Sequence, residues 1–270
     1  MSLLKKLSII AGLGILLLSI AGCHSKAAEP TNVIKVGTIA GPETEIMQVA
    51  KEVAKTEYGL DIEIVTFTDY DQPNEALNDG SIDANVFQHL PYLQQSVAAH
   101  DYKITPIART FIYPMGIYSK RYQTLGQLSK GSIVAIPDDP SNEARALLLL
   151  QQAKLIKLEN GGNALSTPMD IVSNPFNLKI KSLDAAQLPR VLPDVGIAII
   201  NTTYAVPAGL YPNRDALFTE DKNSIYANLV VVRMGDQNKV NEKHLVDALH
   251  SPQVLEATQK FFKGQAIPAW

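Results

Sequence analysis

The chain has 270 residues, with 24 Lys or Arg against 27 Asp or Glu, and its formal net charge is −3. A slightly acidic chain of this length is enough for one large domain or two lobes with proper cores, and its charge does not favour nucleic acid or anionic lipid as a partner. The single cysteine, Cys23, excludes an intramolecular disulfide framework, and lipid modification at this residue would also exclude a thiolate metal site.

The first element in the chain has the pattern of an export signal. Two lysines precede an apolar run from Leu7 to Ile20, and the small residues Ala21 and Gly22 stand directly before Cys23. The run is shorter than the roughly 20 residues that a helix needs to cross a bilayer. We therefore expect residues 1–22 to be removed as a signal peptide and Cys23 to carry the lipid. The alternative is a stray cysteine behind an ordinary signal peptide.

After a short polar tether at residues 23–32, segments typical of strands and helices alternate along the chain. Strands are predicted at 33–38, 61–68, 82–87, 103–110, 112–119, 132–136, 178–183, 195–200 and 226–233. Helices are predicted at 43–58, 73–78, 91–100, 143–155, 185–192, 203–208, 241–250 and 252–262. The first helix should end at Gly59.

This alternation predicts an α/β fold with mainly parallel sheets covered by helices, arranged as two lobes around a cleft. Because no long linker divides the chain, we expect the lobes to share crossings, with 110–119 and 226–233 as the candidates. The expected organisation is a first lobe of residues 33–111 plus 229–270 and a second lobe of residues 112–228.

One helix start contains a basic residue in an unfavourable place. Asp139 or Ser141 can cap the helix and Pro140 suits its first turn, whereas Arg145 is a cation near the positive end of the helix dipole. Free backbone amides together with a guanidinium make a good seat for a carboxylate. The alternative is a solvated arginine that pairs with a neighbouring acid such as Glu143.

Aromatic side chains gather at the ends of neighbouring predicted strands. Phe87, His89 and Tyr92 lie where a strand runs into a helix that begins with proline, and Tyr70 follows the preceding strand. Ligand loops of open α/β sheets lie at this edge, so the rings can line one apolar slot. Ordinary packing between lobes or within a core is the alternative for each ring.

Two asparagines occupy similar positions on other strands. Asn201 follows the apolar strand 195–200, and Asn228 lies within the strand 226–233. A side-chain amide offers both a donor and an acceptor, so it can bond a carboxylate and an ammonium. The alternative is a turn residue, or a strand amide that bonds only to backbone.

The sequence lacks the usual signs of catalysis and metal binding. The five histidines have no metal-ligand spacing, and neither a Gly-x-Ser-x-Gly elbow nor a phosphate-binding loop is present. No pair of acidic residues stands out as a catalytic pair. We therefore expect neither a cofactor nor an enzymatic activity.

Several segments, in this order, resemble the NlpA family of methionine-binding lipoproteins, the substrate-binding proteins of methionine ABC importers. They are the signal with Cys23, Phe67 to Leu77, Asp83 to Leu93, Val134 to Leu150, Ile199 to Ala205 and Asn228 to Val232. The similarity extends to Trp270. It implies the type II periplasmic-binding-protein-like fold, in which two α/β lobes hold one amino acid between them.

The resemblance also implies a role for each candidate residue. Arg145 would bind the methionine carboxylate, and Asn142, Asn201 and Asn228 would contact the polar groups on its α-carbon. The thioether would lie among the aromatic residues, which are Tyr70, Phe87, His89 and Tyr92. The implied protein is a monomer, anchored by its lipid on the extracytoplasmic side, that passes L-methionine to a permease driven by a cytoplasmic ATPase.

Three alternatives stay open from the sequence. The ligand can be another apolar amino acid or a short methionine-containing peptide. The same fold can carry an enzyme, such as a lyase or dehydratase acting on a small carboxylate. A third class is an envelope adhesion or scaffold protein without import function.

Overall fold

The computed structural model describes residues 32–221 and 224–270. The predicted signal peptide, the lipid-attachment site at Cys23 and the tether up to Thr31 lie outside the described residues. Asn32 belongs to the folded part, because its backbone carbonyl accepts a hydrogen bond of 2.9 Å from the amide of Asp61.

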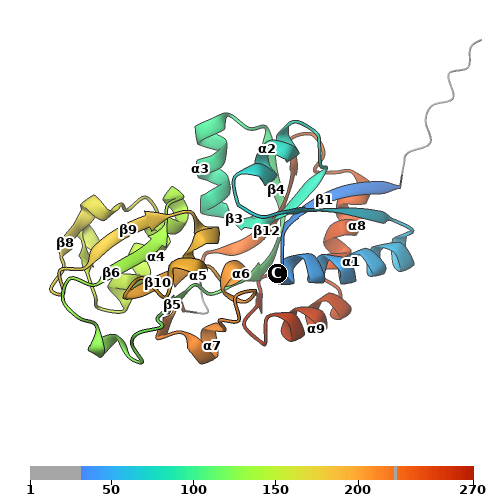
Figure 1. Cartoon of the computed structure of the whole chain (residues 1–270). Coiled ribbons are helices and arrows are strands. Elements are labelled where there is room, and N and C mark those ends of the chain that lie inside the picture. The colour runs from blue at the N-terminus through green and yellow to red at the C-terminus, as the bar shows by residue number, and fades with distance from the viewer. Residues whose placement is uncertain (1–31, 222–223) are drawn as a thin grey trace, which may run out of the picture. The chain divides into compact units, whose positions relative to one another are not determined.

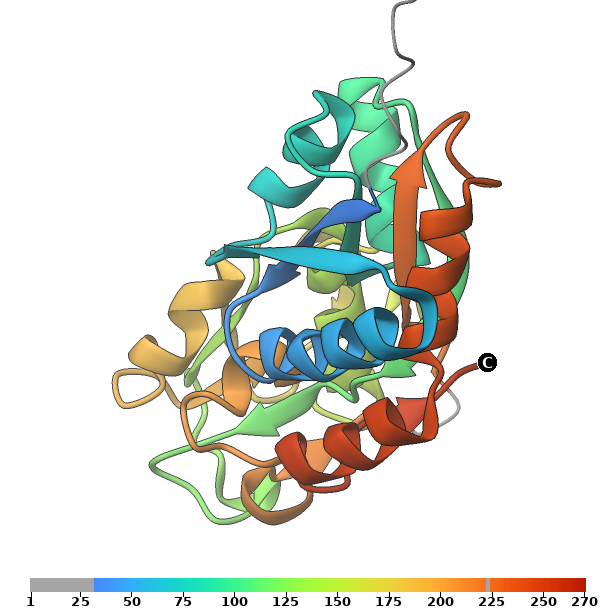
Figure 2. The same ribbon diagram turned by 90° about the vertical axis from the view of Figure 1, so that its right-hand side faces the viewer.

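The larger sheet has the strand order β13-β4-β12-β3-β1-β2 (Figure 1). Its strands are β1 (Val33–Ile39), β2 (Asp61–Phe67), β3 (Ala84–His89), β4 (Ile104–Ile112), β12 (Ala227–Arg233) and β13 (Ile267–Pro268). Helices cover both of its faces (Figure 2): α1 (Pro42–Tyr58), α8 (Val240–Leu249) and α9 (Pro252–Phe261) on one, and α2 (Gln72–Asn78) and α3 (Leu90–His100) on the other.

Side chains of β12 alternate between the two cores of this lobe. Val230 and Val232 are buried with residues of α1, α8 and α9, whereas Leu229 and Val231 are buried with residues of α2 and α3. Successive strand residues point to opposite faces, so a strand covered on both sides must be apolar throughout. This explains why 226–233 is readable as a strand from sequence.

The smaller sheet has the order β11-β5-β10-β6-β9. Its strands are β5 (Gly116–Tyr118), β6 (Ile133–Pro137), β9 (Lys179–Leu183), β10 (Ile197–Ile200) and β11 (Phe218–Thr219). The elements around it are α4 (Pro140–Gln152), α5 (Leu188–Val191), α6 (Thr202–Ala205), α7 (Pro212–Asp215) and a ribbon of β7 (Lys157–Leu158) and β8 (Ile171–Ser173). Within β10, Ile197 and Ile199 pack with α4, and Ala198 and Ile200 pack with α5.

The α/β fold of two lobes is confirmed, but the expectation of mainly parallel sheets is wrong, because both sheets are mixed. β12 runs antiparallel to β3 and β4, and β5 runs antiparallel to β10 and β11. β5 and β12 each follow a passage from the other lobe, so each enters its sheet from the end that faces that lobe. The pairs β13 with β4 and β7 with β8 are also antiparallel, whereas β1 with β2 and β3, and β6 with β9 and β10, are parallel.

The chain passes between the sheets at two places in the described residues. It leaves the larger sheet after Ile112 and enters the smaller one at Gly116, and it returns between Thr219 and Ala227. Pro114 lies in the first passage, where it offers no amide hydrogen to a sheet ladder. The segment 227–233, considered above as a crossing, is a strand of the larger sheet that begins where the second passage ends.

Local signals in the sequence agree with the observed helix ends. α1 has Pro42 in its first turn and is followed by Gly59 in the left-handed conformation, with φ 65°, as predicted. α4 is capped by Asp139, whose carboxylate accepts from the amide of Asn142, and Pro140 is its first residue.

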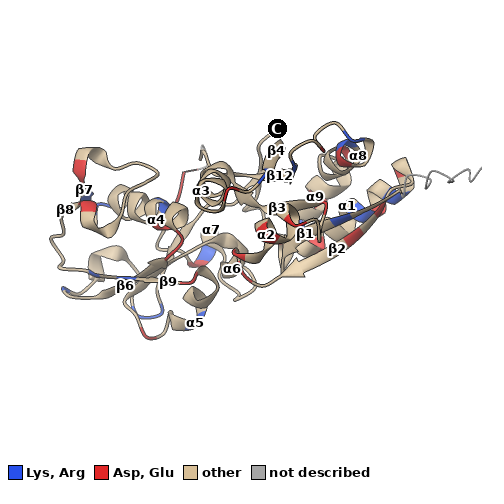
Figure 3. Cartoon of the chain, turned by 90° about the horizontal axis from the view of Figure 1, so that it is seen from above, with Lys and Arg blue, Asp and Glu red and all other residues tan. Residues whose placement is uncertain are grey.

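Figure 3 shows that basic and acidic residues both occur along the ribbon of each lobe. In the part of the chain that the structure describes, no helix combines the length and the apolar character needed to cross a membrane.

Candidate functional site

A pocket of about 360 Å³, counted with its open mouth, lies between the two lobes. The residues that line it are Tyr70, Phe87, Gln88, His89, Tyr92, Tyr113, Asn142, Arg145, Asn201, Thr202, Thr203, Tyr226 and Asn228. The structure thus brings together all eight candidate residues named from the sequence.

The aromatic wall of the pocket belongs to the first lobe. Phe87 lies near the end of β3, Tyr92 in the first turn of α3, and Tyr70 in the loop after β2. The ring of Phe87 lies 5.7 Å from that of Tyr92 and 5.9 Å from that of Tyr70, between ring centroids. The hydroxyl of Tyr92 donates to the backbone carbonyl of Tyr70 at 2.8 Å, which fixes the loop to the helix.

A buried cluster of amides supports this wall from behind. The Gln88 side chain donates to Asn74 (2.5 Å) and to Asn85 (2.9 Å), and Asn85 donates to Asn74 (3.0 Å). Because each donor finds an acceptor inside the core, the cluster specifies one arrangement of the strand end. Phe87 and His89, on either side of Gln88, are thereby held in place.

His89 joins the aromatic wall to the polar one. Its Nδ1 accepts from the amide of Tyr92 at 3.2 Å, and its Nε2 lies 3.2 Å from Oδ1 of Asn142 in the second lobe. Burial, and next the charge of Arg145, lower the pKa of His89 to about 3. The imidazole is therefore neutral at pH 7, and the hydrogen on Nε2 donates to Asn142.

The amides of Asn142 and Asn201 form the polar wall. Asn142 donates to both carboxylate oxygens of Asp139 (3.0 and 3.1 Å) and accepts from Nδ2 of Asn201 (2.8 Å). Oδ1 of Asn201 is buried and has no hydrogen-bond partner among the described residues. A buried acceptor left in this state is costly unless a donor reaches it, and Asn201 is one of the residues that line the pocket.

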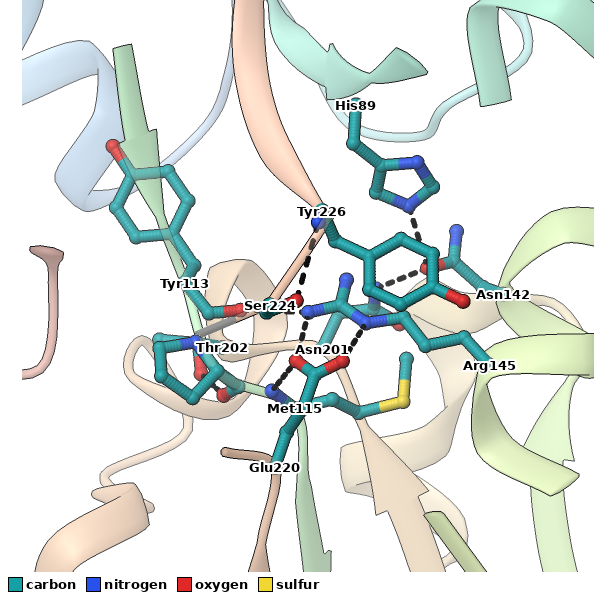
Figure 4. Close-up of polar contacts among 11 residues, drawn as sticks. His89, Tyr113, Met115, Asn142, Arg145, Asn201, Thr202, Glu220, Ser224 and Tyr226 are labelled. Atoms are coloured by element: carbon teal, nitrogen blue, oxygen red, sulfur yellow. Dashed lines mark hydrogen bonds and ion pairs between the residues drawn. The ribbon is translucent and has the colours of Figure 1, made fainter. Parts of the chain in front are cut away.

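Arg145 lies in the second turn of α4 and is 4% exposed. It is held by Glu220, which lies in the passage that returns to the larger sheet (Figure 4). Nε donates to Oε1 of Glu220 at 3.1 Å, and one terminal nitrogen donates to Oε2 at 2.5 Å and to the carbonyl of Tyr113 at 3.1 Å. The guanidinium also lies 4.3 Å from the ring centroid of Tyr226.

Asn228 and Thr203 meet a second buried acid, Glu43, at the start of α1. Asn228 donates to the carbonyl of Phe87 (3.0 Å) and to Oε1 of Glu43 (3.4 Å), and the hydroxyl of Thr203 donates to the same oxygen (3.0 Å). Burial raises the pKa of Glu43 to about 8. Since Thr203 belongs to the second lobe, this contact also bridges the lobes.

Comparisons with known proteins agree with this geometry. The family model described as NlpA lipoprotein matches residues 34–270. The chain belongs to the NlpA lipoprotein family. It is 49% identical, over 98% of its length and 99% of the relative, to the D-methionine-binding lipoprotein MetQ of Salmonella typhi.

Solved structures give the same result. A periplasmic substrate-binding protein of an ABC transporter from Coxiella burnetii superposes with a TM-score of 0.86 at 60% identity, over 87% of this chain and all of that one. A nutrient-binding protein from Burkholderia cenocepacia, solved bound to methionine, superposes with a TM-score of 0.85 at 49% identity, over 88% and 100%.

Sequence reasoning missed several residues that shape the pocket of this NlpA family member. Tyr113 and Tyr226 lie at the passages between lobes, Thr203 lies within the short helix α6, and Glu43 and Glu220 are acids with little exposure. The isolated Tyr-Pro of residues 113–114 is a possible signal for a passage. Glu220 has none, because it is 75 residues from Arg145 and follows only a two-residue strand.

No metal site was expected, and residues 32–221 and 224–270 contain no cluster of three or more His, Cys, Asp or Glu side chains placed to hold a metal ion. The polar side chains of the pocket are amides, hydroxyls and one paired guanidinium. They can bind a small ligand that carries a carboxylate, an ammonium and an apolar side chain.

Proposed function

We propose that this chain is the methionine-binding lipoprotein of an ABC importer. The observation that carries the proposal is a single buried pocket with four aromatic rings on one side and an arginine with three asparagines near it. Methionine has the matching groups: a thioether for the rings and a zwitterionic head for the polar side chains. Relatives across the full chain are named for methionine binding.

The proposed pose places the polar head of the ligand at the polar wall. The ligand carboxylate would lie against Arg145, with Asn142 beside it, and the ammonium would donate to Oδ1 of Asn201, the buried acceptor that lacks a partner among the described residues. Asn228 would complete the polar contacts. The thioether would pack among Tyr70, Phe87, His89 and Tyr92, where sulfur–aromatic contacts add to burial.

The magnitudes are adequate for tight binding. Burying a methionine-sized side chain contributes roughly 1.5–3 kcal/mol, and each hydrogen bond to a charged group contributes about 1.5–3 kcal/mol. Several such contacts offset the costs of ordering and closure and reach the ~8 kcal/mol of micromolar affinity.

The transport context completes the proposal. Cys23 would carry the lipid that holds the protein at the membrane on the extracytoplasmic side, and the folded part would deliver methionine, as a monomer, to a permease with a cytoplasmic ATPase. The contacts of His89 with Asn142 and of Glu43 with Thr203 support closure of the lobes around the ligand. Closure would exclude water and create the surface that the permease recognises.

Calorimetry tests the proposal. The chain from His24 onward is unfolded and refolded to remove bound ligand, then titrated with L-methionine, D-methionine, norleucine, leucine and methionine sulfoxide. We expect one-to-one binding, tightest for methionine. Binding of a different amino acid with no heat from methionine would overturn the substrate, and the absence of any amino-acid binding would overturn the function.

A further inference from the structure

Glu220 is a nearly buried acid that the proposed pose does not use and that contacts the arginine of the pocket. Its side chain is 9% exposed, and it lies in the second passage between lobes. Its amide donates to the carbonyl of Met115 (2.9 Å), and its Oε2 accepts from the amide of Met115 (3.3 Å), so it is tied to the first passage as well. Figure 4 shows its carboxylate between Met115 and the guanidinium of Arg145.

Glu220 occupies one edge of the Arg145 guanidinium. Nε and one terminal nitrogen, the edge that binds carboxylates bidentately, face the two oxygens of Glu220. A ligand carboxylate is left with the other terminal nitrogen. The guanidinium therefore serves two carboxylates, one from the protein and one from the ligand.

Three further titratable side chains, His89, Glu43 and Asp139, line the pocket or bond to residues that line it. His89 is neutral at pH 7, as derived above, and Glu43 is largely protonated because burial raises its pKa to about 8. Asp139 caps α4 and accepts from Asn142 and Ser141 at the positive end of that helix, and burial raises the pKa of its carboxyl. Among the described residues that line the pocket, Arg145 is the one cation, and Glu220 compensates it.

We infer that Glu220 is a specificity-determining residue: by pairing with Arg145 it makes the pocket electroneutral, so that the pocket selects a zwitterion over the anion or the cation with the same side chain. This inference rests on the proposed function. It deepens that function, because aromatic walls select the thioether but do not distinguish an amino acid from its 2-oxo acid.

The physical basis is the cost of a net charge in a buried site. A zwitterion adds equal and opposite charges, whereas a 2-oxo acid adds only a carboxylate and an amino alcohol adds only an ammonium. An uncompensated ion in a poorly solvated pocket costs several kcal/mol. Removing the Glu220 charge leaves Arg145 uncompensated, which should favour the anion and disfavour the cation.

The experiment measures the affinities of three ligands that have the same side chain: L-methionine, its 2-oxo acid (4-methylsulfanyl-2-oxobutanoate) and L-methioninol. We expect the wild-type protein to bind methionine more tightly than either analogue. In Glu220→Gln, the affinity ratio of the 2-oxo acid to methionine should rise at least about tenfold, and the ratio of methioninol to methionine should fall. These opposite shifts separate charge selection from a purely structural role, which would weaken all three ligands together.

Two variants serve as controls. Glu143→Gln also removes one negative charge close to Arg145 in the sequence. Glu143 bonds to Ser182 (2.5 Å) and not to the guanidinium, so this variant should leave both affinity ratios unchanged. Glu220→Asp keeps the charge and should keep the wild-type order of ligands. If Glu220→Gln folds poorly, melting in the presence of each ligand gives the same order, because a ligand of the folded state raises Tm.

The outcomes separate the two proposals. If wild-type protein prefers another amino acid, the methionine assignment fails, and the same test is made with that amino acid and its analogues. If Glu220→Gln and Glu143→Gln change the ratios equally, or neither does, the inference about Glu220 fails while the binding function stands. A wild-type protein that binds none of these ligands overturns both.

Discussion

The two walls of the pocket differ in chemistry and in construction. The wall from the first lobe is aromatic, and its rings come from segments of sequence that lie within 23 residues, from Tyr70 to Tyr92. The wall from the second lobe is polar, and its key contact joins Arg145 to Glu220 across 75 residues. Local sequence can thus position a surface for a side chain, whereas the seat for charged groups is assembled from distant segments and depends on the complete fold.

Substitution of Arg145 in the polar wall should have the largest effect on ligand binding. Arg145→Ala removes the proposed seat of the ligand carboxylate and leaves Glu220 without its partner, which costs about 3–5 kcal/mol of stability. We expect methionine affinity to fall about a hundredfold or more, measured by calorimetry. The double variant Arg145→Met with Glu220→Met should regain most of the stability but not the binding. Retained affinity in either variant would contradict the assignment.

Breaking the aromatic wall should have a smaller, side-chain-dependent effect. Phe87→Ala removes a ring that is 4% exposed and should weaken methionine binding roughly 10- to 100-fold, since it removes about 1.5–3 kcal/mol of burial. Competition with alanine as ligand measures the difference, because alanine does not reach the rings and should be affected less. Phe176→Ala, at a half-buried ring packed against the core of the second lobe, is a control that should lower stability alone. Equal losses for both ligands would argue against the division between walls.

The contacts of Glu43 with Thr203 and Asn228, which join the two lobes, should respond to pH. The pKa of Glu43 is raised to about 8 in the folded protein from an ordinary 4.5, so its neutral form stabilises the fold below pH 4.5 and this stability is lost as pH rises toward 8. Between pH 6.5 and 8 we expect a loss of about 1–2 kcal/mol, measured by urea unfolding, which Glu43→Gln should remove.

This window avoids the opposite effect of His89. Folding lowers its pKa to about 3, so the folded protein loses the stability that comes from the neutral imidazole only as pH falls below about 6.5. Glu63→Gln, at an exposed acid beside Lys35, is the matched control and should keep the wild-type pH profile. The same slope in Glu43→Gln as in wild type would show that Glu43 is not the titrating group.

The smallest effect is expected within the aromatic wall. Tyr92→Phe keeps the ring but removes the hydrogen bond from its hydroxyl to the carbonyl of Tyr70, a loss of about 0.5–1.5 kcal/mol. Methionine affinity should fall by roughly 2- to 10-fold, measured by competition. Tyr122→Phe loses a 3.4 Å contact with Ser132 in the second lobe and should leave affinity unchanged. A similar loss in both variants would place the effect outside the wall.

The sequence predicted the residues that local signals mark, but not the contacts between segments far apart in the chain. Phe87, His89 and Tyr92 were found because strand ends and a proline-started helix are local signals, and Arg145 was found because it breaks a local rule at a helix start. Its partner was not found: the neighbouring acid considered, Glu143, bonds Ser182, and the acid that meets the guanidinium is Glu220. Contacts set by the passages between lobes carry no periodic pattern. The antiparallel direction of β12 was missed for the same reason.

A crystal structure of the protein with L-methionine is the most direct test of the central claim, which is that each wall recognises one part of the ligand. The account predicts the thioether among the rings of Tyr70, Phe87 and Tyr92, and the carboxylate against the side of Arg145 that Glu220 does not occupy. A reversed ligand, with its carboxylate at the aromatic wall, would contradict it, as would a methionine bound outside this pocket.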